Sequence, residues 1–125
     1  MKIWIGLGGL FGGFSVMLGA FGAHSLRDQL APEKLSAFQT ATHYMGLHSL
    51  ALLLVGVLSL QLSEIYSKQL RKVGVFFTTG MLMFSGSILI LSLGGPKLFG
   101  PITPLGGLSL MIGWFILAWT FLRKS

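Results

Sequence analysis

The chain has 125 residues, of which 53% are hydrophobic and 10% are charged. Soluble domains carry roughly 25% charged residues, and a small chain has a large surface relative to its volume. The composition therefore excludes an ordinary soluble domain and predicts that lipid covers most of the surface. The net charge of +6 comes without a basic stripe or a zinc motif, which argues against a nucleic-acid partner. The chain has no cysteine, so disulfides, thiolate metal ligands and thiol catalysis are excluded.

Four apolar stretches predict four transmembrane helices, because none of them contains Asp, Glu, Lys or Arg. They cover about residues 3–23, 44–62, 73–93 and 105–122. Each is close to the ~20 residues that cross a ~30 Å hydrocarbon core as a helix. The apolar runs are continuous and do not alternate, which favours helices over the strands of a barrel. We therefore expect an all-α membrane protein, a four-transmembrane-helix bundle forming one domain over residues 1–125.

Small residues recur at helical spacing in the first span. They are Gly8, Gly12, Ser15, Gly19 and Gly22. The second span has Gly46, Ser49 and Gly56, and the fourth has Gly106, Ser109 and Gly113. Small residues let helix backbones approach closely in lipid. These seams predict packing between helices of one chain, with packing between copies in a homo-oligomer as the alternative.

The second helix is predicted to begin near residue 32, well before its apolar stretch. Pro32 suits a first helical turn and Glu33 suits a helix N-terminus. The run Gly94-Gly95-Pro96 is predicted to end the third span. Pro101 and Pro104 are predicted to bound the loop before the fourth span.

Basic residues predict the orientation of the chain. One side of the predicted bundle carries Lys2, Lys68, Arg71, Lys72, Arg123 and Lys124, and the other carries Arg27, Lys34 and Lys97. The positive-inside rule then places both termini in the cytoplasm, in a multi-pass protein of the cell (plasma or inner) membrane. Trp4 and Trp119 are predicted to lie in an aromatic belt at the inner interface.

Polar side chains concentrate toward the opposite, outer side. The candidate functional cluster consists of His24, His43, Tyr44, His48, Ser87 and Thr103. Ionisable residues within a membrane are functional candidates by default, and histidine can carry protons or bind metals and haem. Structural hydrogen bonding is the favoured interpretation. His43 and His48 lie roughly 140° apart around a helix and make a poor two-ligand site.

Three positions within the predicted spans carry side chains that can make hydrogen bonds. Trp114 lies near the middle of the fourth span, where its indole N–H needs an acceptor. The hydroxyls of Ser85 and Ser87 can bond the preceding turn or a neighbouring helix.

The sequence does not predict an enzyme. It has no hydrolase, kinase or zinc-protease motif. The three acidic residues do not form a credible catalytic pair; they are Asp28, Glu33 and Glu64. We therefore expect no catalytic residues, no bound metal and no cofactor.

An ordered set of motifs resembles domain-of-unknown-function family 423. The motifs are Gly19-Ala20-Phe21-Gly22-Ala23-His24, Thr40-Ala41 leading to Tyr44 and His48, Ser85-Gly86-Ser87, Thr103-Pro104-Leu105-Gly106-Gly107, and Gly113-Trp114. This family comprises YgdD-like small bacterial inner-membrane proteins and is related to human transmembrane protein 256. The resemblance covers nearly the whole chain and implies four spans and no established activity.

Three functions remain open from the sequence. The first is a non-enzymatic membrane component that supports envelope integrity or a larger assembly. The second is an oligomeric transporter or channel for a small solute, an ion or protons. The third is a haem- or metal-binding membrane protein that uses the outer-side histidines. The expected partners are the lipid bilayer, a second copy or a larger membrane assembly, and no nucleic acid.

Overall fold

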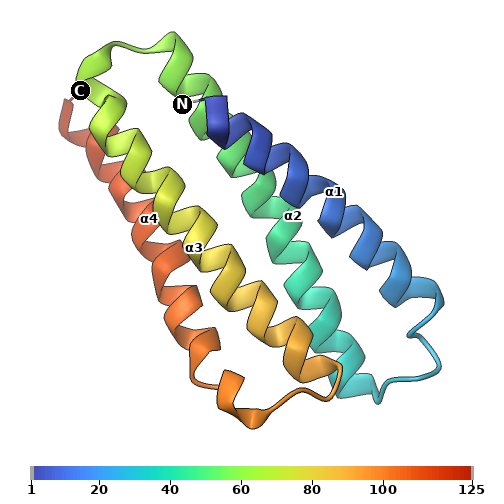
Figure 1. The fold of residues 1–125 in the computed structure, drawn as a ribbon. Coiled ribbons are helices and arrows are strands. Elements are labelled where there is room, and N and C mark those ends of the chain that lie inside the picture. Colours follow the sequence, from blue (N-terminus) through green and yellow to red (C-terminus); the bar gives the residue numbers. More distant parts are fainter. Residues whose placement is uncertain (1, 125) are drawn as a thin grey trace.

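A computed structural model describes residues 2–124 as four long helices joined by short connections (Figure 1). The long helices are α1 (Lys2–His24), α2 (Pro32–Gln61), α3 (Ser67–Ser92) and α4 (Ile102–Lys124). Two single-turn 3₁₀ helices, η1 (Glu64–Tyr66) and η2 (Lys97–Phe99), lie in the second and third connections. All four long helices have the length and apolar composition needed to cross a membrane. The predicted all-α, four-span fold class is confirmed.

Each helix packs mainly on its neighbour in the chain. The principal interfaces are α1–α2, α2–α3 and α3–α4. The helices run up and down, so both termini and the α2–α3 connection lie at one end of the molecule, called here the terminal end (Figure 1). The α1–α2 and α3–α4 connections lie at the other end, called the loop end (Figure 1).

α2 starts with Pro32 in its first turn, the residue near which the sequence places its beginning. Proline is tolerated there because first-turn N–H groups have no acceptor within the helix. A helix of 30 residues is about 45 Å long, which exceeds the ~30 Å hydrocarbon core by about 15 Å. The first turns of α2 lie beside the last turn of α3, where both line a pocket with Ile88 and Leu91.

α3 ends in a Schellman motif built on glycine. The Gly94 N–H donates to Leu91 O at 3.1 Å, and the Gly95 N–H donates to Ile90 O at 2.8 Å. Gly94 has φ +91°, in the left-handed region that only glycine adopts readily. Pro96 follows and cannot continue the helix.

α4 begins earlier than the prolines predict. Pro104 was expected to bound the loop, but the helix starts at Ile102 and includes Pro104 in its first turn. The prediction was wrong because a proline in the first turn removes no intrahelical hydrogen bond. Thr103 consequently lies on the helix and can reach α3.

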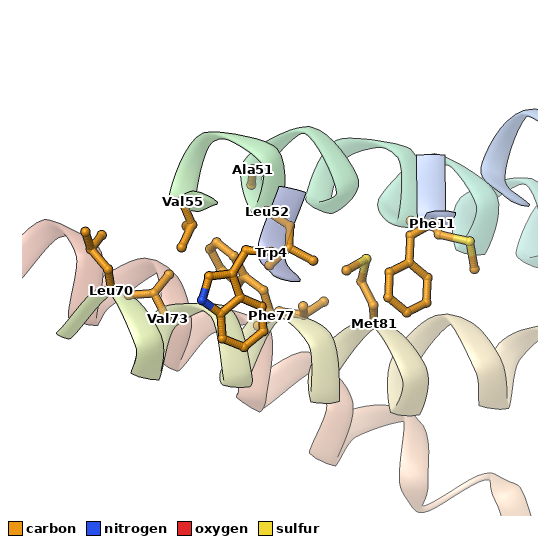
Figure 2. Close-up of a cluster of buried hydrophobic side chains, with 11 residues drawn as sticks. Trp4, Phe11, Ala51, Leu52, Val55, Leu70, Val73, Phe77 and Met81 are labelled. Atoms are coloured by element: carbon orange, nitrogen blue, oxygen red, sulfur yellow. The ribbon is translucent and has the colours of Figure 1, made fainter. Parts of the chain in front are cut away.

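The apolar core lies between α2 and α3 and includes the side chain of Trp4 from α1 (Figure 2). Trp4 is 7% exposed. A Cβ at Gly74 would lie 2.6 Å from Trp4 Cδ2, so the indole occupies space that only glycine leaves on α3. The aromatic-belt prediction is therefore wrong for Trp4, which turns inward. Trp119 is 65% exposed.

The outer surface of the bundle is apolar on all four helices. Val16, Leu54, Leu82 and Phe115 are examples, and each is more than half exposed. Every charged side chain between residues 2 and 123 is exposed, and the sequence separates them all from the apolar stretches. This distribution is that of a protein whose solvent is lipid around the middle and water at the ends.

The glycine seam of α1 packs against α2 within the same chain. A Cβ at Gly8 would lie 2.8 Å from Ser49 O, and one at Gly22 would lie 2.9 Å from the Phe38 ring. Gly12 and Ser15 similarly meet Ser49 and Gly46. Gly19 departs from the expected seam, since nothing lies within 4 Å of a Cβ placed there.

Glycines also set the spacing of the α3–α4 interface. A Cβ at Gly106 would overlap the backbone of Phe84, and one at Gly113 would lie 2.7 Å from the ring of Phe77. In the second helix, a Cβ at Gly56 would lie 2.9 Å from the backbone nitrogen of Ile5. These seams hold neighbouring backbones of one chain close together, as small residues do in lipid.

Candidate functional site

His48 is buried within α2 and both of its ring nitrogens are hydrogen-bonded. It is 3% exposed. Its Nε2 accepts a hydrogen bond from the Trp114 indole N–H at 3.0 Å, and its Nδ1 lies 2.8 Å from Tyr44 O. Tryptophan can only donate, so Nε2 must be the acceptor and Nδ1 must carry the proton. The arrangement thus defines one neutral tautomer in which the imidazole is fully satisfied.

Aromatic rings surround this imidazole. Phe77 of α3 meets His48 edge-on, with ring centroids 5.4 Å apart. The Trp114 ring packs against Phe77 at 4.9 Å, and the Tyr44 ring packs against Phe84 at 5.0 Å. The group ties α2, α3 and α4 together at one level, by aromatic packing and by one hydrogen bond across the bundle.

Serine hydroxyls make further hydrogen bonds between helices. Ser85 Oγ donates to Ala41 O on α2 at 3.0 Å, and Ser109 Oγ donates to Phe76 O on α3 at 2.8 Å. Ser87 and Thr103 share a short hydroxyl–hydroxyl bond between α3 and α4. Ser87 and Thr103, which the sequence places in the candidate polar cluster, therefore contact each other directly.

The predicted polar cluster does not form a single site. His48 pairs with Trp114, whereas Ser87 pairs with Thr103. His24 is exposed at the end of α1, and His43 is exposed on a different face of α2 from His48. Within residues 2–124 no three His, Cys, Asp or Glu side chains come close enough to hold a metal ion. His43 and His48 lie on different faces of α2 because a spacing of five residues corresponds to roughly 140° around a helix.

A groove runs along the seam between α1 and α2. This α1–α2 groove has a volume of about 640 Å³ and is lined by Gly12, Ser15, Val16, Gln39, Thr42, His43, Gly46, Leu47, Ser49 and Leu50. The hydroxyls of Ser15, Thr42 and Ser49 each donate to a carbonyl three residues earlier in their own helix. The groove therefore offers few free donors, and these lie at its loop end on Gln39 and His43.

A second hollow lies at the loop end between α2, α3 and α4. This loop-end pocket has a volume of about 350 Å³ and is lined by Glu33, Lys34, Ala37, Ile88, Leu91, Ser92 and Thr103. Ser92 is 3% exposed. Among the described residues, Ser92 Oγ and Thr78 Oγ1 are the buried side-chain polar atoms without a hydrogen-bond partner.

Sequence reasoning missed two features of these sites. It required an acceptor for Trp114 but did not identify His48 as that acceptor, because the two residues are 66 positions apart. It also did not single out Ser92, since a serine near a helix end is common and nothing in its neighbours marks it. Glu33 and Ser92 line the same pocket because the start of α2 lies beside the end of α3.

Comparisons with known proteins agree with these observations. The model of the family described as "Protein of unknown function (DUF423)" matches residues 18–107. A UPF0382 membrane protein of Staphylococcus aureus is 41% identical over 117 residues, covering 94% of this chain and 93% of its own. A relative in Staphylococcus saprophyticus is 39% identical, and YwdK of Bacillus subtilis is 38% identical, each with 94% of both chains covered.

No solved structure matches the chain. The family match spans all of α2 and α3, the positions of His48, Ser87 and Ser92, and the first turns of α4. The resemblance drawn from the ordered motifs is thereby confirmed. The chain belongs to the DUF423 family, whose relatives here are UPF0382 membrane proteins of uncharacterised role.

Proposed function

We propose that this multi-pass membrane protein is a non-catalytic component of the bacterial cell membrane that supports envelope integrity as part of a larger assembly. The observation that carries the proposal is the hydrogen bonding of His48. Both ring nitrogens are occupied, one by Trp114 and the other by Tyr44 O. The most deeply buried ionisable group is thus used to join helices.

The same use of polar groups extends through the bundle. The hydroxyls of Ser85, Ser87 and Ser109 bond across helix interfaces. A metal or haem iron at His48 would have to displace either the Trp114 indole or the Tyr44 carbonyl. A proton taken up at His48 Nε2 would have to break the bond from Trp114. These features support a structural role over the transport and cofactor-binding alternatives.

A free face of α1 supports association with another membrane protein. Gly6, Gly9 and Gly13 form a second row of glycines, and nothing lies within 4 Å of a Cβ placed on any of them. Small residues on an exposed transmembrane face permit close approach of another helix. Gly8, Gly12, Ser15 and Gly22, by contrast, already meet α2.

The orientation belongs to the same proposal. The terminal end carries Lys2, Lys68, Arg71, Lys72 and Arg123. By the positive-inside rule this end faces the cytoplasm, and the loop end, with the loop-end pocket, faces outward.

The test is complementation of a strain that lacks the gene. We expect the deletion to increase sensitivity to detergent or hypo-osmotic shock, and His48→Gln to restore resistance when its membrane level matches that of the unmodified protein. A glutamine can accept a hydrogen bond from the Trp114 indole N–H through its amide oxygen, but its amide does not gain or lose a proton. His48→Leu, which keeps neither bond, serves as the comparison.

Two results would contradict the proposal. One is loss of complementation by a correctly folded His48→Gln variant, which would indicate proton or metal chemistry at the imidazole. The other is an unaltered deletion phenotype across these stresses together with no copurifying membrane protein.

A further inference from the structure

We propose that the loop-end pocket binds one phospholipid with a phosphoethanolamine head, placing its ammonium at Glu33, its phosphate at Lys34 and its glycerol–ester region at Ser92. The inference is independent of the proposed structural role. It rests on the shape of the pocket, on the buried hydroxyl of Ser92 and on the two rim charges.

The walls of the pocket change from polar to apolar with depth. On α2, Glu33 and Ala37 lie one turn apart on the same face, with Glu33 nearer the loop end. On α3, Ser92 and Ile88 repeat this order. Both walls therefore pass from polar to apolar over about 6 Å, the rise of four helical residues. That gradient matches the boundary between the head and the chain of a phospholipid.

Ser92 supplies the hydrogen-bond donor at this boundary. Its side chain is 3% exposed and its Oγ has no partner among residues 2–124. A buried hydroxyl without a partner is destabilising unless something accepts its hydrogen. An ester carbonyl oxygen lies at this level of a bilayer lipid and can accept the bond.

Charge complementarity on the rim selects the head group. Glu33 and Lys34 line the pocket with opposite charges and both are exposed. A primary ammonium offers three N–H donors to the Glu33 carboxylate, whereas a quaternary ammonium offers none. A phosphate can pair with the Lys34 ammonium. Phosphatidylethanolamine fits this arrangement better than a choline lipid, and a glycerol head would leave Glu33 without its cation.

The experiment measures lipid retention by native mass spectrometry of the purified full chain. The protein is released from nanodiscs containing equal parts of phosphatidylethanolamine, its N,N-dimethyl and N,N,N-trimethyl forms, and phosphatidylglycerol, all with the same chains. We expect one phosphatidylethanolamine to be retained about fivefold over the trimethyl form, a modest ratio because exposed ion pairs contribute little. The dimethyl form should lie between them.

Variants separate the two parts of the site. Glu33→Gln should bring the retention of the ethanolamine and trimethyl forms to parity, while Glu64→Gln at the terminal end should leave the preference intact. Ser92→Ala should lower retention of all four lipids about threefold, the effect of one neutral hydrogen bond, without changing their ratio. Ser59→Ala is its control, because the Ser59 hydroxyl bonds Gly56 O within its own helix.

Equal retention of all four lipids by the unmodified chain would overturn the proposal. So would a preference for phosphatidylglycerol, or a preference for ethanolamine that survives Glu33→Gln. Helical circular dichroism and elution volume are measured for each variant, and Ala37→Leu, which narrows the pocket from its α2 wall, gives an independent test of occupancy. Undiminished retention in folded Ala37→Leu protein would place the lipid elsewhere.

Discussion

At the residue scale, the hydrogen bond between His48 and Trp114 sets how α2 and α4 lie relative to one another. The Trp114 indole has one polar atom and needs one acceptor, while the His48 imidazole has two, of which Nε2 is that acceptor. The bond between them connects α2 to α4, which are not neighbours in the chain. Since Trp114 is the donor and His48 the acceptor, replacing either residue with an apolar one leaves the other partly unsatisfied.

Trp114→Phe is therefore expected to destabilise the folded chain by about 1–2 kcal/mol, because it leaves Nε2 of a buried imidazole without a donor. Unfolding in mixed micelles, followed by circular dichroism, measures the change. Trp119→Phe is the matched control, since Trp119 is 65% exposed. An equal loss in the two variants would show that the hydrogen bond contributes nothing beyond the volume of the ring.

Ser85 provides a second test at this scale. Removing its hydroxyl in Ser85→Ala deletes a buried hydrogen bond to Ala41 O and should cost about 0.5–1.5 kcal/mol. The same unfolding measurement on Ser59→Ala should show a smaller loss, because that hydroxyl bonds within its own helix. If the two substitutions were equivalent, bonds between helices would have no special weight in this bundle.

At the scale of elements, close packing of α3 and α4 depends on which of two adjacent glycines faces the interface. A Cβ at Gly106 would overlap the backbone of Phe84, which cannot move aside as a side chain can. A Cβ at Gly107 would lie 3.6 Å from the Phe84 ring, an ordinary contact. Gly106 and Gly107 thus lie on the same helix at nearly the same depth but have different neighbours.

Gly106→Ala should destabilise the protein by about 1–3 kcal/mol through overpacking, net of the gain in helix propensity. Gly107→Ala should be neutral or slightly stabilising. Thermal unfolding in detergent compares the two, and a larger loss at Gly107 would mean that α4 is rotated relative to the arrangement described above.

The sequence predicted elements better than it predicted their contacts. Apolar runs without charges define transmembrane helices directly, and Pro32 marked the start of α2. The loop before α4 was overestimated because a proline is compatible with a first helical turn. Trp4 was assigned to the membrane interface because tryptophan is common there. Its indole instead packs into the space that Gly74 leaves on α3. That space can be recognised only when the relative position of α1 and α3 is known.

The predicted polar site shows the same limit. Spacing correctly separated His43 from His48 on α2, since both belong to one helix of known periodicity. It could not join His48 to Trp114, Ser87 to Thr103, or Glu33 to Ser92. Each of these relations depends on the relative depth and rotation of different helices, which no local pattern encodes.

At the scale of the whole molecule, orientation in the membrane is open to direct test. The chain has no cysteine, so single cysteines can be introduced without removing any. In intact cells, a membrane-impermeant maleimide should label Ser25→Cys in the α1–α2 connection and spare Ser63→Cys in the α2–α3 connection. Permeabilised cells should label both, which is the control. Labelling of Ser63→Cys alone in intact cells would reverse the proposed topology.

The packing of each helix on its chain neighbour has a consequence for biogenesis. α1 can pair with α2, and α2 with α3, as soon as each leaves the translocon, because these interfaces need no later segment. Local contacts of this kind favour rapid assembly. The bond from Trp114 to His48 is different, since it spans 66 positions and forms only after α4 has entered the bilayer. It is therefore one of the last steps of folding, and until it forms the buried imidazole lacks its Trp114 partner.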